Sequence, residues 1–211
     1  MPYFKNNRIN LLFIHIPKTG GSSLEKYFNV KYNIPLNYKS LMSTAKITSL
    51  SLLDKPEINS SLQHLTYNTI IKYKDFFKID TNNIEIMTIV RNPYDKIISD
   101  LFYLKKINID SSKEDVYNKI QIYLTEEHDN HVIPQYKFII NHKEQLIPDI
   151  KILHTETLND DMAKLGYKDF NIKMNMNPNR VNCEDYLNND SINLINKIYE
   201  KDFEILNYNK K

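Results

Sequence analysis

Glycine is rare in this chain. Only three glycines occur among its 211 residues, where the average usage of roughly 7% would give about fifteen. Two of the three, Gly20 and Gly21, follow Lys18 and Thr19 directly. Because glycine can adopt a positive φ and leaves no Cβ between the backbone and a ligand, the pair indicates a special backbone requirement at this place.

Cysteine and long apolar runs are also missing. Cys183 is the only cysteine, which excludes an intrachain disulfide and a cysteine-based zinc site and is typical of a reducing compartment. No apolar run reaches the length of about 18 residues that spans a membrane, and the opening residues MPYFKNNRIN lack the apolar core of a signal peptide. We therefore expect no membrane anchor and a cytoplasmic location, in a bacterium or, for a viral protein, in its host.

Neither sign of charge prevails. The 28 basic and 26 acidic residues give a net charge of +2, which is too even to predict general binding to nucleic acid. Arginine occurs only at Arg8, Arg91 and Arg180, so recognition of an anion would be local. With 41% hydrophobic residues the chain can bury one good core, and we expect a single domain over residues 1–211.

The segment LLFIHIPKTGGSSLEKYF, residues 11–28, has the pattern of a strand, a tight loop and a helix. An apolar, β-branched run over residues 10–16 predicts the strand, and Ser22 or Ser23 is predicted to cap the helix. The unpaired N–H groups of a helix start, the charge of Lys18 and the nearby hydroxyl groups suit an anion. The pattern predicts a phosphate-binding loop, with a capped helix after an ordinary turn as the alternative.

This loop differs from the nucleoside-triphosphate pattern G-x-x-x-x-G-K-[ST]. The lysine precedes the glycines, Pro17 stands before it, and no glycine lies upstream. The predicted loop is therefore P-loop-like in its chemistry but inverted in its order.

A second strand and helix repeat this arrangement. In NIEIMTIVRNPYDKIISDLFYL, residues 84–90 predict a buried strand and Pro93 begins a helix, with Arg91 where the strand ends. Ligands of open α/β sheets bind at the carboxyl ends of strands, so Lys18 and Arg91 are expected to face one crevice. Ser99 could add a hydroxyl to the same phosphate, but Arg91 in a structural salt bridge and Ser99 as an ordinary helix serine are the alternatives.

The remaining segments complete an α/β pattern. The polar stretch 33–61 predicts an irregular excursion, and residues 150–154 predict a third strand followed by a short helix. Further helices are predicted over 64–77, 113–124, 134–140 and 191–208. We expect a single α/β domain with a central, mainly parallel sheet flanked by helices and a P-loop-like phosphate-binding loop.

Several of these segments resemble a known family. FIHIPKTGGSS looks like the 5′-phosphosulfate loop of the sulfotransferases that use 3′-phosphoadenosine-5′-phosphosulfate (PAPS), and IVRNPYDKIISDLF looks like their 3′-phosphate strand and helix. The match is to the carbohydrate branch, which includes heparan 2-O-sulfotransferases and chondroitin sulfotransferases. It continues through HVIPQYKFI, ILHTETLNDDMAKL and IYEKDFEILNY, and so covers residues 11–208 apart from the middle excursion.

The resemblance implies in-line transfer of a sulfuryl group from PAPS to a hydroxyl, most simply of a glycan. Arg91 and Ser99 would hold the 3′-phosphate, and HLTY resembles the segment that carries the catalytic histidine of the 2-O-sulfotransferases, which makes His64 the expected base. The 5′-phosphosulfate would be held by Lys18, Thr19, Gly20, Gly21, Ser22 and Ser23. Lys18 would also act in catalysis, by stabilising the leaving oxygen.

The other histidines are weaker candidates for the catalytic base. His15 and His154 lie on predicted strands and are interpreted as packed residues. His131 with Gln135 matches a pattern of the family and could line the acceptor site. If His64 is not the base, His131 and the carboxylates of residues 54–57 come next. No histidine and carboxylate cluster has metal-ligand spacing, and we expect no metal.

Two other functions stay open. A small-molecule kinase would use a nucleoside triphosphate, but it should carry a P-loop of the other order and an acid at the strand end for Mg²⁺, where this chain has Arg91. A non-catalytic module that binds phosphoadenosine or a glycan would keep both loops but needs no base. The sequence fixes neither the acceptor nor the oligomeric state.

Overall fold

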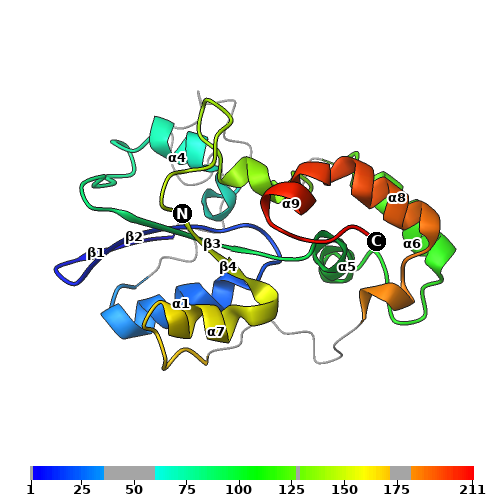
Figure 1. Ribbon diagram of the computed structural model, residues 1–211, viewed down its shortest axis with the longest axis horizontal. Coiled ribbons are helices and arrows are strands. Elements are labelled where there is room, and N and C mark those ends of the chain that lie inside the picture. The colour runs from blue at the N-terminus through cyan, green and yellow to red at the C-terminus, as the bar shows by residue number, and fades with distance from the viewer. Residues whose placement is uncertain (1, 36–59, 127–128, 172–181) are drawn as a thin grey trace.

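The computed structural model describes residues 2–35, 60–126, 129–171 and 182–211. Its sheet has the strand order β1-β2-β3-β4 (Figure 1). The strands are β1 (Tyr3–Asn6), β2 (Ile9–Ile14), β3 (Glu85–Val90) and β4 (Lys151–His154). β1 and β2 form an antiparallel hairpin, whereas β2, β3 and β4 pair in parallel.

Helices follow and cover these strands. The α-helices are α1 (Gly21–Tyr32), α4 (Tyr67–Lys72), α5 (Pro93–Tyr103), α6 (Lys113–Tyr123), α7 (Leu158–Lys164), α8 (Asn189–Ile198) and α9 (Glu200–Ile205). Short 3₁₀ turns are η2 (Leu62–His64), η3 (Gln135–Phe138), η4 (Thr155–Thr157) and η5 (Cys183–Asp185). Among the described residues, none of these helices is both long and apolar enough to cross a membrane.

Strand β2 shows how the sheet is buried on both faces. Leu11 and Phe13 pack in the core that α1 and α7 cover, and Leu12 and Ile14 pack in the core on the opposite face, which α4 and η3 cover. All four side chains are fully buried. Successive residues of a strand point to opposite faces, so a central strand covered on both sides reads as a continuous apolar run.

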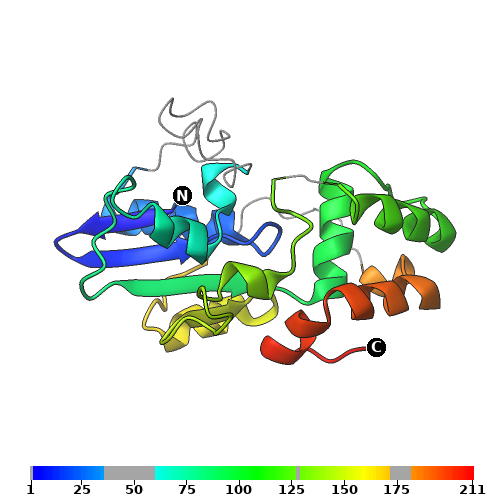
Figure 2. The same cartoon turned by 90° about the horizontal axis from the view of Figure 1, so that it is seen from above.

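The parallel register brings three strand ends to one edge of the sheet. Ile14 pairs with Thr88, and Val90 pairs with His154, so the chain leaves β2, β3 and β4 on the same side. Beyond this edge lies a third core, made by α5, α6, α8 and α9 (Figures 1 and 2). The loops at the strand ends therefore lie between the sheet and this helical group.

The predicted fold class is confirmed: the chain forms an α/β fold with a mostly parallel sheet flanked by helices. The strand and helix around Arg91 also lie where predicted. The side chain of Asn92 accepts a hydrogen bond from the N–H of Tyr94, and Pro93 occupies the first turn of α5. Both features favour a helix start at this place.

Three predicted helices differ in length or type from the helices in the structure. The segment 191–208 forms two helices, because Tyr199 ends α8 and precedes α9. The segment 64–77 contains only the short α4, which Thr66 caps by accepting from the N–H of Thr69. The segment 134–140 is the 3₁₀ turn η3. Most of the predicted excursion, including the carboxylates of residues 54–57, lies outside the described residues.

Candidate active site

The loop between β2 and α1 contains two residues in the left-handed region. Lys18 has a φ of 65° and Gly20 a φ of 91°, and Gly20 is the N-cap of α1. The predicted cap at Ser22 or Ser23 was wrong: the carbonyl of Gly20 accepts from the N–H of Ser23, so the helix begins earlier. The buried Thr19 hydroxyl donates to the carbonyl of Ile16 over 2.9 Å and closes the loop.

Positions 20 and 21 require glycine for different structural reasons. Gly20 needs its positive φ, and nothing lies within 4 Å of the place where its Cβ would be. Gly21 has helical geometry, but a Cβ there would lie 2.6 Å from Nε2 of His15. The missing side chain of Gly21 thus makes room for the imidazole of His15 and not for a ligand.

His15 belongs to a buried polar cluster under this loop. Its Nδ1 pairs with Oε1 of Glu25, and Nε2 of Gln63 lies 3.0 Å from that nitrogen and from both carboxylate oxygens. Burial alone would raise the pKa of Glu25, but His15 and Gln63 hold it below its usual value. These contacts agree with the interpretation of His15 as a packed residue that supports the loop.

Lys18 and Arg91 meet at the carboxyl edge of the sheet, as expected. Nη1 of Arg91 donates to the carbonyl oxygen of Lys18 over 3.2 Å. The hydroxyl of Thr155, just after β4, lies 2.7 Å from the carbonyl oxygen of Thr19 and 2.9 Å from that of Val90. One hydroxyl therefore connects the ends of β3 and β4 to the loop that follows β2.

The two cations are half-buried, and nearby carboxylates attract each of them from beyond ion-pair distance. Neither Lys18 nor Arg91 forms an ion pair with a carboxylate in the described parts of the chain. Burial lowers the pKa of Lys18, and Arg91 and Lys96 lower it further against the attraction of Asp100. Burial likewise lowers the pKa of Arg91. An anion that enters between them would gain from both charges.

Gln135 fixes the backbone of Arg91. Its Oε1 accepts from the N–H of Arg91 over 2.9 Å, and its Nε2 donates to the carbonyl over 2.8 Å. The side chain is fully buried. Asp202 of α9 in turn accepts from the backbone N–H groups of Gln135 and Tyr136. Gln135, assigned from the sequence to the acceptor site, thus directs its amide to Arg91.

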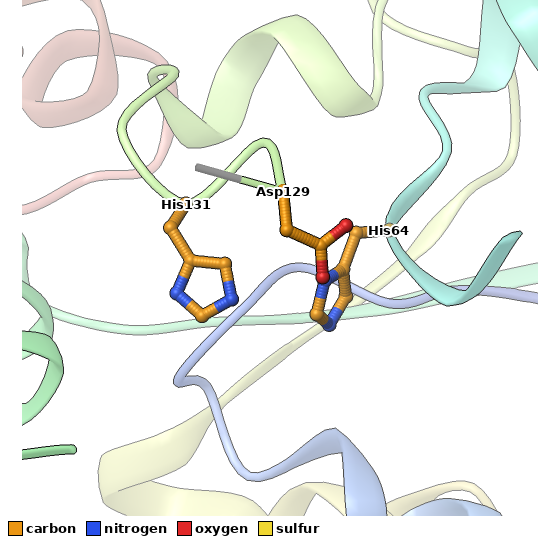
Figure 3. A group of neighbouring side chains, drawn as sticks. All are labelled: His64, Asp129 and His131. Atoms are coloured by element: carbon orange, nitrogen blue, oxygen red, sulfur yellow. The ribbon is translucent and has the colours of Figure 1, made fainter. Parts of the chain in front are cut away.

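His64 is paired with a carboxylate that sequence reasoning did not identify. Its Nδ1 lies 2.7 Å from Oδ2 of Asp129 (Figure 3). Burial, with contributions from His15 and His131, lowers the pKa of His64 to about 4 although Asp129 opposes the shift. The imidazole is therefore neutral at pH 7, and a proton on Nδ1 leaves Nε2 as the hydrogen-bond acceptor.

His131 forms another histidine and carboxylate pair beside His64. The two ring centroids are 5.2 Å apart, and Nδ1 of His131 lies 2.8 Å from Oδ1 of Asp100. The carbonyl oxygen of His131 accepts from the buried Nζ of Lys96 over 2.7 Å. His15 lies 5.2 Å from His64 on the other side, so three histidines form a row with a carboxylate on each.

Tyr103 links Lys18 to this row. Its ring stacks on His131 with centroids 6.1 Å apart and an interplanar angle of 15°. Nζ of Lys18 lies 3.8 Å from the centroid of the same ring. The ring of Tyr103 therefore contacts both the ammonium group of Lys18 and the imidazole of His131.

Sequence reasoning did not identify Lys96, Asp100 or Asp129 as partners of the histidines. Lys96 and Asp100 lie one turn apart on α5 and are buried, and charged residues on the apolar face of a predicted helix were a readable signal. No sequence pattern could have identified Asp129, because its contact with His64 depends on where the loop before η3 lies. Ser22 and Ser99 are half-buried on α1 and α5, and Ser23 is buried; their roles stay predictions.

An open depression elsewhere on the molecule is not part of this site. Glu85, Met87, Lys151, Leu165 and Tyr167 line it. Glu85 and Lys151 begin β3 and β4, so the depression lies at the amino ends of the strands. The cations and histidines gather at the carboxyl ends.

An α/β sheet with two cations at the carboxyl ends of its parallel strands is suited to binding an anion there. A family model described as the sulfotransferase family matches residues 1–209. The chain therefore belongs to the sulfotransferase family, and sulfuryl transfer is its reaction class. Searches of curated proteins and of solved structures gave no match.

Proposed function

We propose that this chain transfers the sulfuryl group of PAPS to a hydroxyl of a carbohydrate acceptor, with all of residues 1–211 acting as one domain. The observation that carries the proposal is the hydrogen bond from Arg91 to the carbonyl of Lys18. It holds two desolvated cations from two strand ends side by side. A nucleotide with phosphate groups at both its 3′ and 5′ positions offers one anion to each.

The 5′-phosphosulfate is assigned to the loop after β2. Lys18 supplies the charge, and we assign the backbone N–H groups at the start of α1, beginning with Gly21, as further donors. The exposed Gly20 lets the backbone approach the ligand without a side chain between them. Since the Thr19 hydroxyl donates to Ile16, we assign Thr19 to the ligand through its backbone N–H only.

Arg91 and Ser99 are assigned to the 3′-phosphate. Arg91 offers a guanidinium that is desolvated and therefore attracts an anion strongly. Gln135 holds the backbone of Arg91 in place through two hydrogen bonds, and we propose that it acts as a positioning residue for this arginine. No metal is needed to bind this nucleotide in the proposed scheme.

His64 is the proposed general base. As the acceptor oxygen attacks sulfur, Nε2 of His64 takes its proton, the new O–S bond forms, and the S–O bond to the 5′-phosphate breaks. Asp129 keeps the ring in the correct tautomer and stabilises the imidazolium that forms. The pKa of about 4 keeps the base neutral before the donor binds, and the charge of a bound polyanion would raise it.

Lys18 is the group that stabilises the leaving phosphate. Negative charge grows on the bridging oxygen as its bond to sulfur breaks, and an ammonium held in a partly desolvated site interacts with it more strongly than water would. Tyr103 contacts both Lys18 and His131, and we propose that this contact positions the ammonium group of Lys18 for the transfer.

The carbohydrate acceptor rests on the resemblance of HLTY and HVIPQYKFI to the carbohydrate branch. We assign His131 to the acceptor side, because it lies next to His64, the proposed base. A kinase reading is less well supported, since the residue that follows β3 is Arg91 and not an acid for Mg²⁺.

Calorimetry with 3′-phosphoadenosine 5′-phosphate tests the nucleotide assignment. The protein should bind this nucleotide much more tightly than ATP and without Mg²⁺. Binding of Mg-ATP at equal or higher affinity would favour the kinase. Incubation of the protein with a radiolabelled sulfate donor and a panel of glycans then tests transfer, and tight nucleotide binding without any turnover would favour a non-catalytic module.

A further inference from the structure

We propose that His64, Asp129 and His131 form a binding site for a divalent transition-metal ion such as Zn²⁺, and that an ion bound there inhibits sulfuryl transfer. One nitrogen from each imidazole and one carboxylate oxygen lie within 4.8 Å of one another (Figure 3). Only the inhibition rests on the proposed function. The binding site itself rests on the geometry alone.

Hydrogen bonds hold the two ligand-bearing segments together. The backbone N–H of Ser61 donates to Oδ1 of Asp129, Nδ1 of His64 pairs with Oδ2, and Nδ2 of Asn130 donates to the carbonyl of His64 over 2.8 Å. Asp129 and Asn130 both have a positive φ, 45° and 61°. This sharp turn places Asp129 and His131 on the same side of the loop, and strained backbone of this kind concentrates at functional sites.

The donor set suits Zn²⁺. Two imidazoles and a carboxylate are common protein ligands of this ion, and they leave a fourth position for water. Bond lengths of 2.0–2.2 Å in a tetrahedral site place the ligand atoms about 3.3 Å apart, so the cluster would have to contract by at most about 1.5 Å. Nδ1 of His64 and Oδ2 of Asp129, which lie 2.7 Å apart, would have to separate by about 0.6 Å. The contraction falls on the wider spacings within the cluster.

His131 has the outer partner that metal-binding histidines usually have. Its Nδ1 lies 2.8 and 3.0 Å from the two oxygens of Asp100, and Tyr123 donates to the same carboxylate over 2.6 Å. A carboxylate on one ring nitrogen fixes the tautomer and makes the other nitrogen a better ligand. In Figure 3 the other nitrogen of His131 is turned toward Asp129 and His64.

An ion at this site would remove the base in either of two ways. If it binds Nε2 of His64, it occupies the atom that takes the proton. If it binds Nδ1, the ring proton moves to Nε2, which can then no longer accept one. Both cases leave the acceptor hydroxyl without a base.

Calorimetry of the chelator-treated protein with ZnCl₂ is the direct test. The wild type should bind one ion saturably, and its thermal transition should rise with ZnCl₂ because the ion binds the folded state. Asp129→Asn, which keeps the shape of the side chain, and His131→Ala should each abolish this binding. Asp100→Asn should weaken it by about 10–100-fold, as loss of an outer partner does.

His142→Ala is the matched control, since His142 is exposed and outside the cluster; it should bind Zn²⁺ like the wild type. Absence of saturable binding to the wild type would overturn the site. So would undiminished binding by Asp129→Asn, which would place the ion elsewhere. If Zn²⁺ binds as described but does not slow sulfuryl transfer by an active preparation, the inhibition is overturned while the metal site stands.

Discussion

The imidazole of His15 occupies the space that a side chain on Gly21 would need. A Cβ at position 21 would lie 2.6, 2.7 and 2.8 Å from three atoms of this ring. The ring is held by Glu25 and Gln63, so it is not free to turn away. The start of α1, which presents the N–H groups of the phosphate loop, is thereby packed directly against a fixed histidine.

Gly21→Ala should therefore destabilise the protein. We expect a loss of about 1–3 kcal/mol in the free energy of unfolding, the usual cost of overpacking a buried site. Urea denaturation measures it. The control is the same substitution in a His15→Ala background, where the clash is gone and the cost should shrink. Equal costs in both backgrounds would contradict the clash.

Arg91→Ala should weaken binding of 3′-phosphoadenosine 5′-phosphate by roughly 1.5–3 kcal/mol, because it removes a charge-assisted pair with the 3′-phosphate. Adenosine 5′-phosphosulfate, which lacks that phosphate, should bind almost unchanged. Arg8→Ala is the control, since Arg8 is exposed on the β1–β2 hairpin. Equal losses for both nucleotides would make Arg91 a structural residue that only holds the loop of Lys18.

Substitutions at His64 and Lys18 should separate chemistry from binding. His64→Ala should keep nucleotide affinity nearly intact while kcat falls by about two to four orders of magnitude, because proton transfer matters only in the transition state. Lys18→Ala should lower both affinity and kcat. Steady-state kinetics and calorimetry give the two quantities. A folded His64 variant with near-normal turnover would move the base to another residue, with His131 next.

Tyr103 should act by positioning Lys18. A cation over an aromatic ring gains about 0.5–2 kcal/mol, so Tyr103→Leu should lower kcat/KM by roughly 2–30-fold through a misdirected ammonium. Tyr103→Phe keeps the ring and should behave like the wild type. If the leucine variant instead bound the nucleotide more tightly and turned over faster, the ring would be competing with the donor for Lys18.

His64 should make the protein sensitive to mild acid. Its pKa is about 4 in the folded protein and about 6.5 in the unfolded chain, so the unfolded chain binds the proton first as pH falls. Stability is therefore full above pH 6.5 and should decrease by up to about 3 kcal/mol toward pH 4. His64→Gln cannot take up this proton, so urea denaturation at pH 7 and 4.5 should show a smaller loss in the free energy of unfolding than for the wild type. Parallel losses would contradict the neutral, buried imidazole.

The sequence alone determined the fold class and the placement of Lys18 and Arg91 at the carboxyl edge of the sheet. Both depend on local patterns: apolar strands, the order of Lys18 and the glycines after a strand, and Arg91 at the next strand end. The carboxyl ends of parallel strands meet at one edge, so strand-end residues can be placed together before a structure is known. Helix ends were less predictable, because Tyr199 interrupts an apolar pattern that continues through it.

Only the tertiary structure decided the partners of the histidines. Asp129 and His64 are separated by 65 positions, and no periodicity relates a loop before η3 to the turn η2. The reason for Gly21 was likewise hidden, since the ring that excludes a side chain there comes from the end of the preceding strand. A strand, loop and helix can be recognised from neighbouring residues, whereas a histidine and its carboxylate partner can be far apart in the sequence and meet only in the folded chain.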